Sequence, residues 1–131
     1  MINLIKPALL FIGLVFWGCD SKGIINGGYY KNDNMDRLNT YYLYDFISKE
    51  KVKNHAMESV YTKGGTTANY YFSYNSKIPS HSLELAKSLS EANKLIDDYS
   101  YNIKYAFIRN NSGEMRFVDC SESPDDKLCN P

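Results

Sequence analysis

Few side chains in this sequence are suited to acid–base or metal chemistry, because its 131 residues include only two histidines. His55 and Glu58 are three residues apart, a spacing at which two side chains on one helical face can share a metal ion. No third ligand lies nearby in the sequence, and His81 follows Pro79-Ser80 at the start of a predicted helix. The serines are not set in the G-x-S-x-G pattern that presents a nucleophile at a sharp turn. We therefore predict no catalytic residue, no metal site and no cofactor, and we do not expect an enzyme.

The three cysteines suggest a different chemistry. Cys120 and Cys129 enclose a short polar loop, and they are the pair left for a disulfide if Cys19 is modified. Closing a loop of this size stabilises a fold by about 2–3 kcal/mol. The alternative is a metal site, but this spacing without a nearby histidine is poor for zinc. We predict a disulfide between Cys120 and Cys129 that ties the polar tail, residues 121–131, to the last strand.

Two helices are predicted from apolar residues at three- and four-residue steps. The first covers residues 35–53, where the apolar positions are Met35, Leu38, Tyr42 and Phe46. The second begins at residue 80 or 82 and continues to residue 98, with Leu85, Leu89, Ala92 and Ile96 on one face.

Two hairpins are predicted from alternating residues around glycine-containing turns. The first covers residues 58–75, with a turn at residues 63–66; the second covers residues 101–120, with a turn at residues 110–113. The expected fold is therefore α+β, in the order α-β-β-α-β-β. It would have two layers, with an antiparallel sheet of about four strands covered on one face by the two helices.

The first 18 residues have the pattern of an export signal. Lys6 is the only charge before Asp20, and the apolar stretch between them is about a dozen residues long, which is short of the roughly 20 that span a bilayer. The end of this stretch, Gly18-Cys19, resembles the lipobox of bacterial lipoproteins. That resemblance implies cleavage before Cys19 and a lipid on its thiol. The alternative is an uncleaved N-terminal anchor, since Trp17 stands where the family prefers a small residue.

The resemblance also sets the expected layout and location of the chain. Residues 1–18 would be the signal peptide, residues 19–34 a glycine-containing flexible tether, and residues 35–131 one small domain. In enteric-type bacteria an aspartate after the lipidated cysteine resembles an inner-membrane retention signal, so Asp20 favours that membrane. Asp20 could instead simply begin the polar tether. With the lipid on Cys19 in the cell membrane, the domain would lie on the periplasmic face of that membrane.

Composition limits the possible partners. Without Lys6 the chain keeps 14 basic and 15 acidic residues, a balance that argues against a nucleic-acid partner. Its twelve tyrosines suit strands and also protein-binding surfaces. The favoured hypothesis is a non-catalytic envelope lipoprotein that binds or scaffolds another envelope protein. The alternatives are an inhibitor or immunity lipoprotein and a small periplasmic hydrolase.

Overall fold

The computed structural model describes residues 23–44, 47–74 and 80–131. The predicted signal peptide, Cys19 and Asp20 lie outside these residues. The described ranges contain five strands: β1 (Ile24–Lys31), β2 (Arg37–Leu43), β3 (Thr67–Ser73), β4 (Ile103–Arg109) and β5 (Met115–Asp119). The helices are α2 (Lys49–Glu58), α3 (Ser80–Glu84) and α4 (Leu89–Asp97), with single 3₁₀ turns at Ser100–Asn102 and Lys127–Cys129. None of the described helices is long and apolar enough to cross a bilayer.

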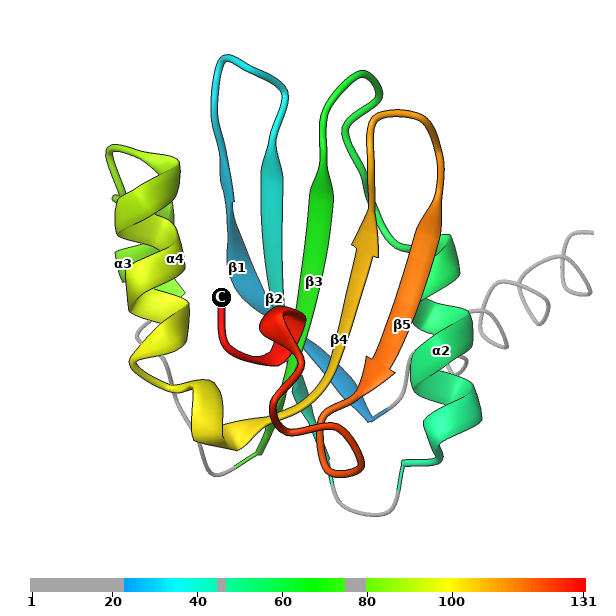
Figure 1. The fold of residues 1–131 in the computed structure, drawn as a ribbon. Helices are drawn as coiled ribbons and strands as arrows, with labels where there is room; N and C mark the ends of the chain where they lie inside the picture. The colour runs from blue at the N-terminus through cyan, green and yellow to red at the C-terminus, as the bar shows by residue number, and fades with distance from the viewer. Residues whose placement is uncertain (1–22, 45–46, 75–79) are drawn as a thin grey trace, which may run out of the picture.

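The strands form one mixed sheet in chain order, β1-β2-β3-β4-β5. The β2–β3 pair is parallel, and the other three pairs are antiparallel (Figure 1). Parallel neighbours need a crossover connection, which α2 supplies between β2 and β3. The α+β class is therefore correct, but the sheet has five strands rather than four and is not purely antiparallel.

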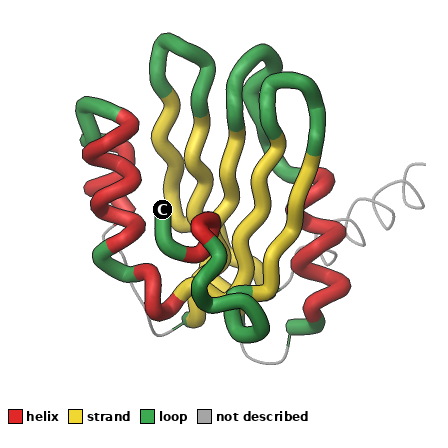
Figure 2. Tube along the Cα trace, viewed as in Figure 1, coloured by secondary structure: helices red, strands yellow, loops and turns green. Residues whose placement is uncertain are grey.

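Helices cover both faces of the sheet, so the predicted arrangement with helices on one face is wrong (Figure 2). Ala92 and Ile96 of α4 pack with Tyr70 on one face. Val52 and Ala56 of α2 pack on the other face with Tyr41, Tyr71 and Phe107. A strand points successive side chains to opposite faces, which is why Tyr70 and Tyr71 belong to different cores.

The predicted tether and first helix are also corrected. Residues Ile24–Lys31 form edge strand β1, with a bulge between Asn26 and Gly28, where Gly28 has φ +106°. Residues 37–43 form β2 between β1 and β3, and four successive residues, Leu38 to Tyr41, are buried. A strand buried on both faces shows no alternation, and the sequence pattern then matches a helix by chance.

The other predicted elements are partly correct. In the first hairpin only β3 forms, because α2 continues to Glu58 and residues 59–66 contain no strand. The second helix is split into α3 and α4, and Leu85 between them is 74% exposed. Ser88 begins α4 by accepting a hydrogen bond from the Glu91 N–H at 3.1 Å.

The second hairpin is confirmed as β4 and β5, joined by the turn at residues 110–113. Strand β4 contains one irregularity in its pairing with β3. Tyr71 pairs with Tyr105 and Phe72 with Ile103, so Lys104 is an extra residue in β4. This bulge turns Ile103 toward the α4 side, whereas Tyr105 and Phe107 face α2.

Candidate functional site

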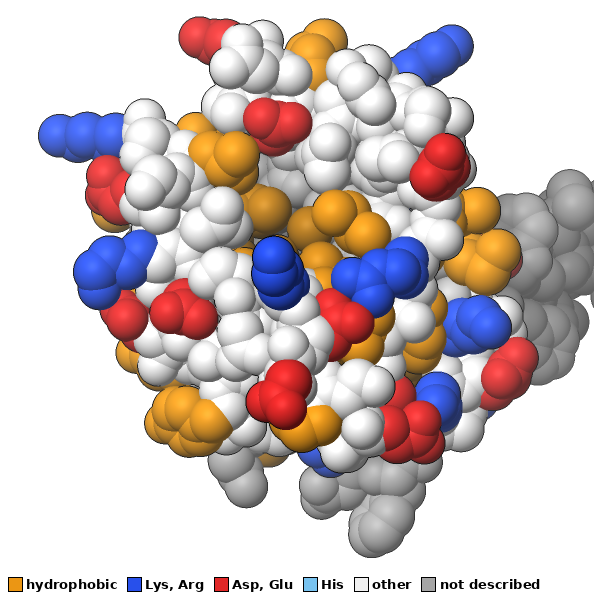
Figure 3. Space-filling model, viewed as in Figure 1, with side chains coloured by type: hydrophobic (Ala, Val, Ile, Leu, Met, Phe, Trp, Pro, Cys, Tyr) orange, Lys and Arg blue, Asp and Glu red, His pale blue; other side chains and the backbone are white. Residues whose placement is uncertain are grey.

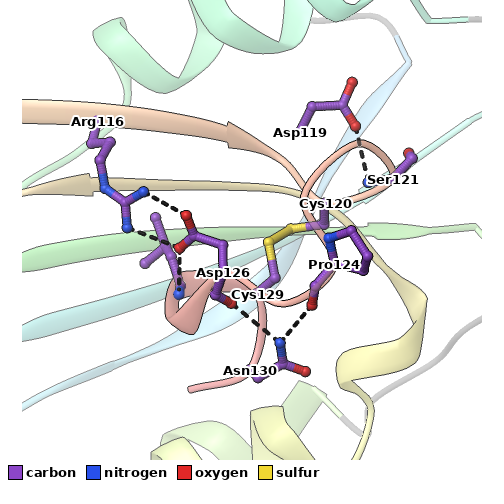
Figure 4. Close-up of a disulfide and its surroundings, with 9 residues drawn as sticks. Arg116, Asp119, Cys120, Ser121, Pro124, Asp126, Cys129 and Asn130 are labelled. Carbon is purple, nitrogen blue, oxygen red and sulfur yellow. Dashed lines mark hydrogen bonds and ion pairs between the residues drawn. A yellow bond between two sulfur atoms is a disulfide. The ribbon is translucent and has the colours of Figure 1, made fainter.

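The predicted pairing of Cys120 with Cys129 is present in the structure, with the two Cα atoms 5.8 Å apart and both residues buried. Arg116 of β5 also binds the tail, because its guanidinium donates two hydrogen bonds to the Asp126 carboxylate, at 2.7 and 2.9 Å (Figure 4). Together with the N–H of Leu128, these bonds lower the pKa of Asp126 to about 2. The tail is therefore held against β5 by a covalent bond and an ion pair.

His55 ends a chain of hydrogen bonds beneath α2. The guanidinium of Arg37 donates to the amide oxygen of Asn39 at 2.7 Å, and Asn39 donates to the amide oxygen of Asn69 at 2.9 Å. Asn69 in turn donates to the Tyr71 hydroxyl at 3.3 Å. The Tyr71 hydroxyl lies 2.8 Å from Nδ1 of His55. A guanidinium can only donate, so the bonds run in one direction from Arg37 as far as the Tyr71 hydroxyl, which accepts from Asn69.

The chain ends at two titratable groups, Tyr71 and His55. The Tyr71 hydroxyl can donate to Nδ1 of His55 or accept from it, and the tautomer of the ring decides which. Burial lowers the pKa of His55, and nearby Glu58 opposes that shift. The side chain of Tyr71 is fully buried, and its own pKa is raised by burial. The chain thus joins half-buried His55 of α2 to the sheet through the buried side chains of Tyr71, Asn69 and Asn39.

The two histidines considered in the sequence analysis are not brought together in any described site. The partner of His55 is a tyrosine hydroxyl, and no cluster of three potential metal ligands occurs among the described residues. His81 lies in α3, but its side chain is outside the described part of the structure.

An exposed cluster lies where α2 ends and β4 meets its turn. We call it the Arg109 patch: Met57, Val60, Tyr61, Arg109 and Met115. The four uncharged members are 47–62% exposed. The Arg109 guanidinium lies 4.1 Å from the centre of the Tyr61 ring and donates to the Met57 carbonyl at 2.9 Å. Its buried Nε has no acceptor among the described residues. Tyrosine, methionine and arginine are enriched at protein interfaces.

A groove of about 770 Å³ continues from this patch along the free edge of β5. One wall is α2, the floor is Met115–Asp119, and the other wall is the disulfide-tied tail. We call this the edge groove. It is closed at one end by Lys49, whose Nζ lies 3.3 Å from Asp119 and 3.6 Å from Glu122. Burial raises the pKa of Asp119, but hydrogen bonds from Ser121 and Lys49 outweigh burial and leave the pKa lowered.

Sequence reasoning did not find the patch or the groove. Both form between segments far apart in the chain, which the predicted α-β-β-α-β-β order did not place side by side. One usable signal was present: Lys49, Lys53 and Met57 recur at four-residue steps and share one face of α2.

Comparison with known proteins identifies no relative, since no protein family, curated protein or solved structure matches the chain.

Proposed function

We propose that the protein is an exported, lipid-anchored envelope protein that binds another protein through the Arg109 patch. The observation that carries the proposal is the composition of that patch. It groups exposed methionine, valine and tyrosine side chains around one arginine. Exposed apolar clusters of this kind mark interaction sites, and scattered single apolar residues do not.

The charge distribution supports a protein partner over nucleic acid. On the face that carries the C-terminal tail, basic and acidic side chains are interspersed (Figure 3). The whole chain has 15 basic and 15 acidic residues. Nucleic-acid binding needs a continuous basic surface that neutralises several phosphates.

The anchor is proposed from the sequence, through Cys19 and the residues before it. The intact mass of protein extracted from membranes tests it directly. The expected mass is that of residues 19–131 plus lipid, increasing by a pair of hydrogens on reduction of the Cys120–Cys129 bond. A mass that retains Met1 and lacks lipid would contradict lipidation.

Photo-crosslinking in intact cells tests the binding site. A benzoylphenylalanine replaces Tyr61 in the full chain, and the matched control carries it at Tyr101, which is 83% exposed next to the opposite end of β4. We expect one dominant protein adduct from position 61 and none of that mass from position 101. Equal labelling from the two positions, or no adduct from position 61 at native abundance, would refute the proposed site.

A further inference from the structure

The two edge strands of the sheet, β1 and β5, have different surroundings. The edge at β1 is interrupted by the bulge between Asn26 and Gly28 and is packed against α3. The edge at β5 borders the edge groove instead, and no described strand pairs with it there. An open strand edge is a template for another strand, so proteins usually cover or interrupt it.

The hydrogen-bond pattern shows which groups of β5 face the groove. The Asn110 N–H bonds to Glu114 and the Cys120 N–H bonds to Lys104, both at 2.9 Å. In an antiparallel ladder every second residue of a strand is hydrogen-bonded to its partner strand. Counting from Glu114 to Cys120 in steps of two, Arg116 and Val118 are the residues whose backbone groups bond to β4. The N–H and C=O groups of the intervening residues point outward.

These outward groups belong to Met115, Phe117 and Asp119. The Asp119 carbonyl is already satisfied by the N–H groups of Glu122 and Ser123, at 3.1 and 2.9 Å. Both groups of Met115 and of Phe117, and the N–H of Asp119, have no hydrogen-bond partner within the described ranges. The groove floor therefore offers five backbone groups in the spacing of a strand.

Residues along α2 lie opposite residues along β5 over the length of the groove. Lys49 meets Asp119 at one end, and Met57 lies beside Arg109, the β4 partner of Met115, at the other. Eight residues of helix rise about 12 Å, and four residues of strand span about 13.6 Å. Lys53 therefore stands midway, opposite Phe117. No described carboxylate lies within ion-pair distance of Lys53, so Lys53 is an unpaired cation between the Lys49–Asp119 ion pair and the apolar end of the groove. Glu50 also lines the groove, without an ion pair to any described residue, one helical turn before Lys53.

We propose that the edge groove takes an extended segment of the partner as a sixth strand, antiparallel to β5, with an acidic residue beside Lys53 and an apolar residue two positions later beside Met57 and Met115. Strand addition is a known mode of peptide recognition, in which backbone bonds give affinity and side-chain pockets give specificity. This inference rests on the proposed function, because it specifies how the partner is held next to the Arg109 patch.

A second copy of this chain fits the groove less well. Antiparallel pairing of two β5 strands about Phe117 would place the Asp119 carboxylate of one copy against Met57 and Met115 of the other. It would also place a methionine against the Lys49–Asp119 ion pair. Desolvating a carboxylate beside apolar side chains is unfavourable, so the groove favours a different sequence.

Hydrogen exchange of the full chain in detergent tests the proposal, with the peptide acetyl-Thr-Thr-Glu-Thr-Leu-Thr-amide as the probe. At a peptide concentration ten times Kd, exchange at the amides of Met115 and Phe117 should slow about tenfold. Arg116 and Val118 are internal controls, because their amides already bond to β4. Unchanged exchange at Met115 and Phe117 despite peptide binding would overturn strand addition. Protection that instead rises with protein concentration alone would identify a second copy as the occupant.

Altered peptides and variants test the register. N-methylation of the peptide glutamate, whose N–H faces β5, should abolish binding, and N-methylation of the threonine that follows it should not. Lys53→Glu should weaken binding about threefold and favour a probe with lysine in place of glutamate. Lys51→Glu makes the same charge change on α2 outside the groove and should have no effect. Equal effects of both methylations or of both substitutions would refute the register. A Tyr61 adduct that persists without β5 protection would leave the proposed function intact and overturn only this inference.

Discussion

Removing the disulfide should destabilise the domain by an amount set by its short loop. The substitution is Cys120→Ala with Cys129→Ala, since both positions are buried and alanine adds no polar group. The cysteines are 9 residues apart in sequence. The chain-entropy relation for a loop of about 10 residues gives about 2.7 kcal/mol. For a domain of about 110 residues this corresponds to a Tm lower by about 12 °C.

Urea unfolding of the full chain, followed by circular dichroism, measures this loss. The denaturant slope should rise in the variant, because an unfolded chain without the bond exposes more surface. Reductant should reproduce the loss in the wild-type chain and leave the variant unchanged. A loss below about 0.5 kcal/mol would refute the reasoning, because the bond would then restrict the unfolded chain far less than the chain-entropy relation requires.

Three further outcomes are expected. Asn69→Ala should lower the free energy of unfolding by about 3 kcal/mol in urea titrations, since three hydrogen bonds of a fully buried amide are lost; a loss under 1 kcal/mol would contradict the network. The pKa of His55 is lowered in the folded state, so the unfolded chain binds more protons below pH 6.5. Stability should fall as the pH decreases through 6.5, and His55→Gln should flatten this dependence in thermal melts; an unchanged slope would exclude His55 as its source. Finally, Arg116→Ala should speed hydrogen exchange at the Leu128 amide, which bonds to Asp126, and equal exchange rates would show that the ion pair does not order the tail.

The sequence predicted best where local signals and burial agree. The β4–β5 hairpin was found because two alternating stretches flank the polar turn at residues 110–113, and the bulge at Lys104 changes only the face of Ile103. The disulfide followed from cysteine spacing and the inferred export. The helix prediction for residues 37–43 was wrong because Asn39 and Thr40, polar side chains within β2, are as buried as the apolar residues beside them. Their burial is satisfied by bonds to distant residues, such as Asn39 to Asn69, which no local pattern reveals.

Strand β1 and the candidate site were not predicted from the sequence, for related reasons. The glycines of β1 indicate flexibility, but Gly28 serves a bulge and its carbonyl accepts a bond from Thr40 at 2.9 Å. The groove depends on the placement of Lys53 opposite Phe117, which requires knowing that α2 and β5 are neighbours. Tertiary pairing supplies this information, and the sequence pattern of each element does not.

The chain order of the strands has a consequence for how the sheet assembles. Each described strand joins the edge formed by the strand before it, so no strand must insert between two that are already paired. The β1–β2 and β4–β5 pairs are local, and hairpins form in about 1–10 μs. The pairings on either side of β3 close the long connections at residues 44–66 and 74–102. These two closures raise the contact order, so docking of β3 should limit the folding rate, and until it occurs the two hairpins should persist as separate units with open edges.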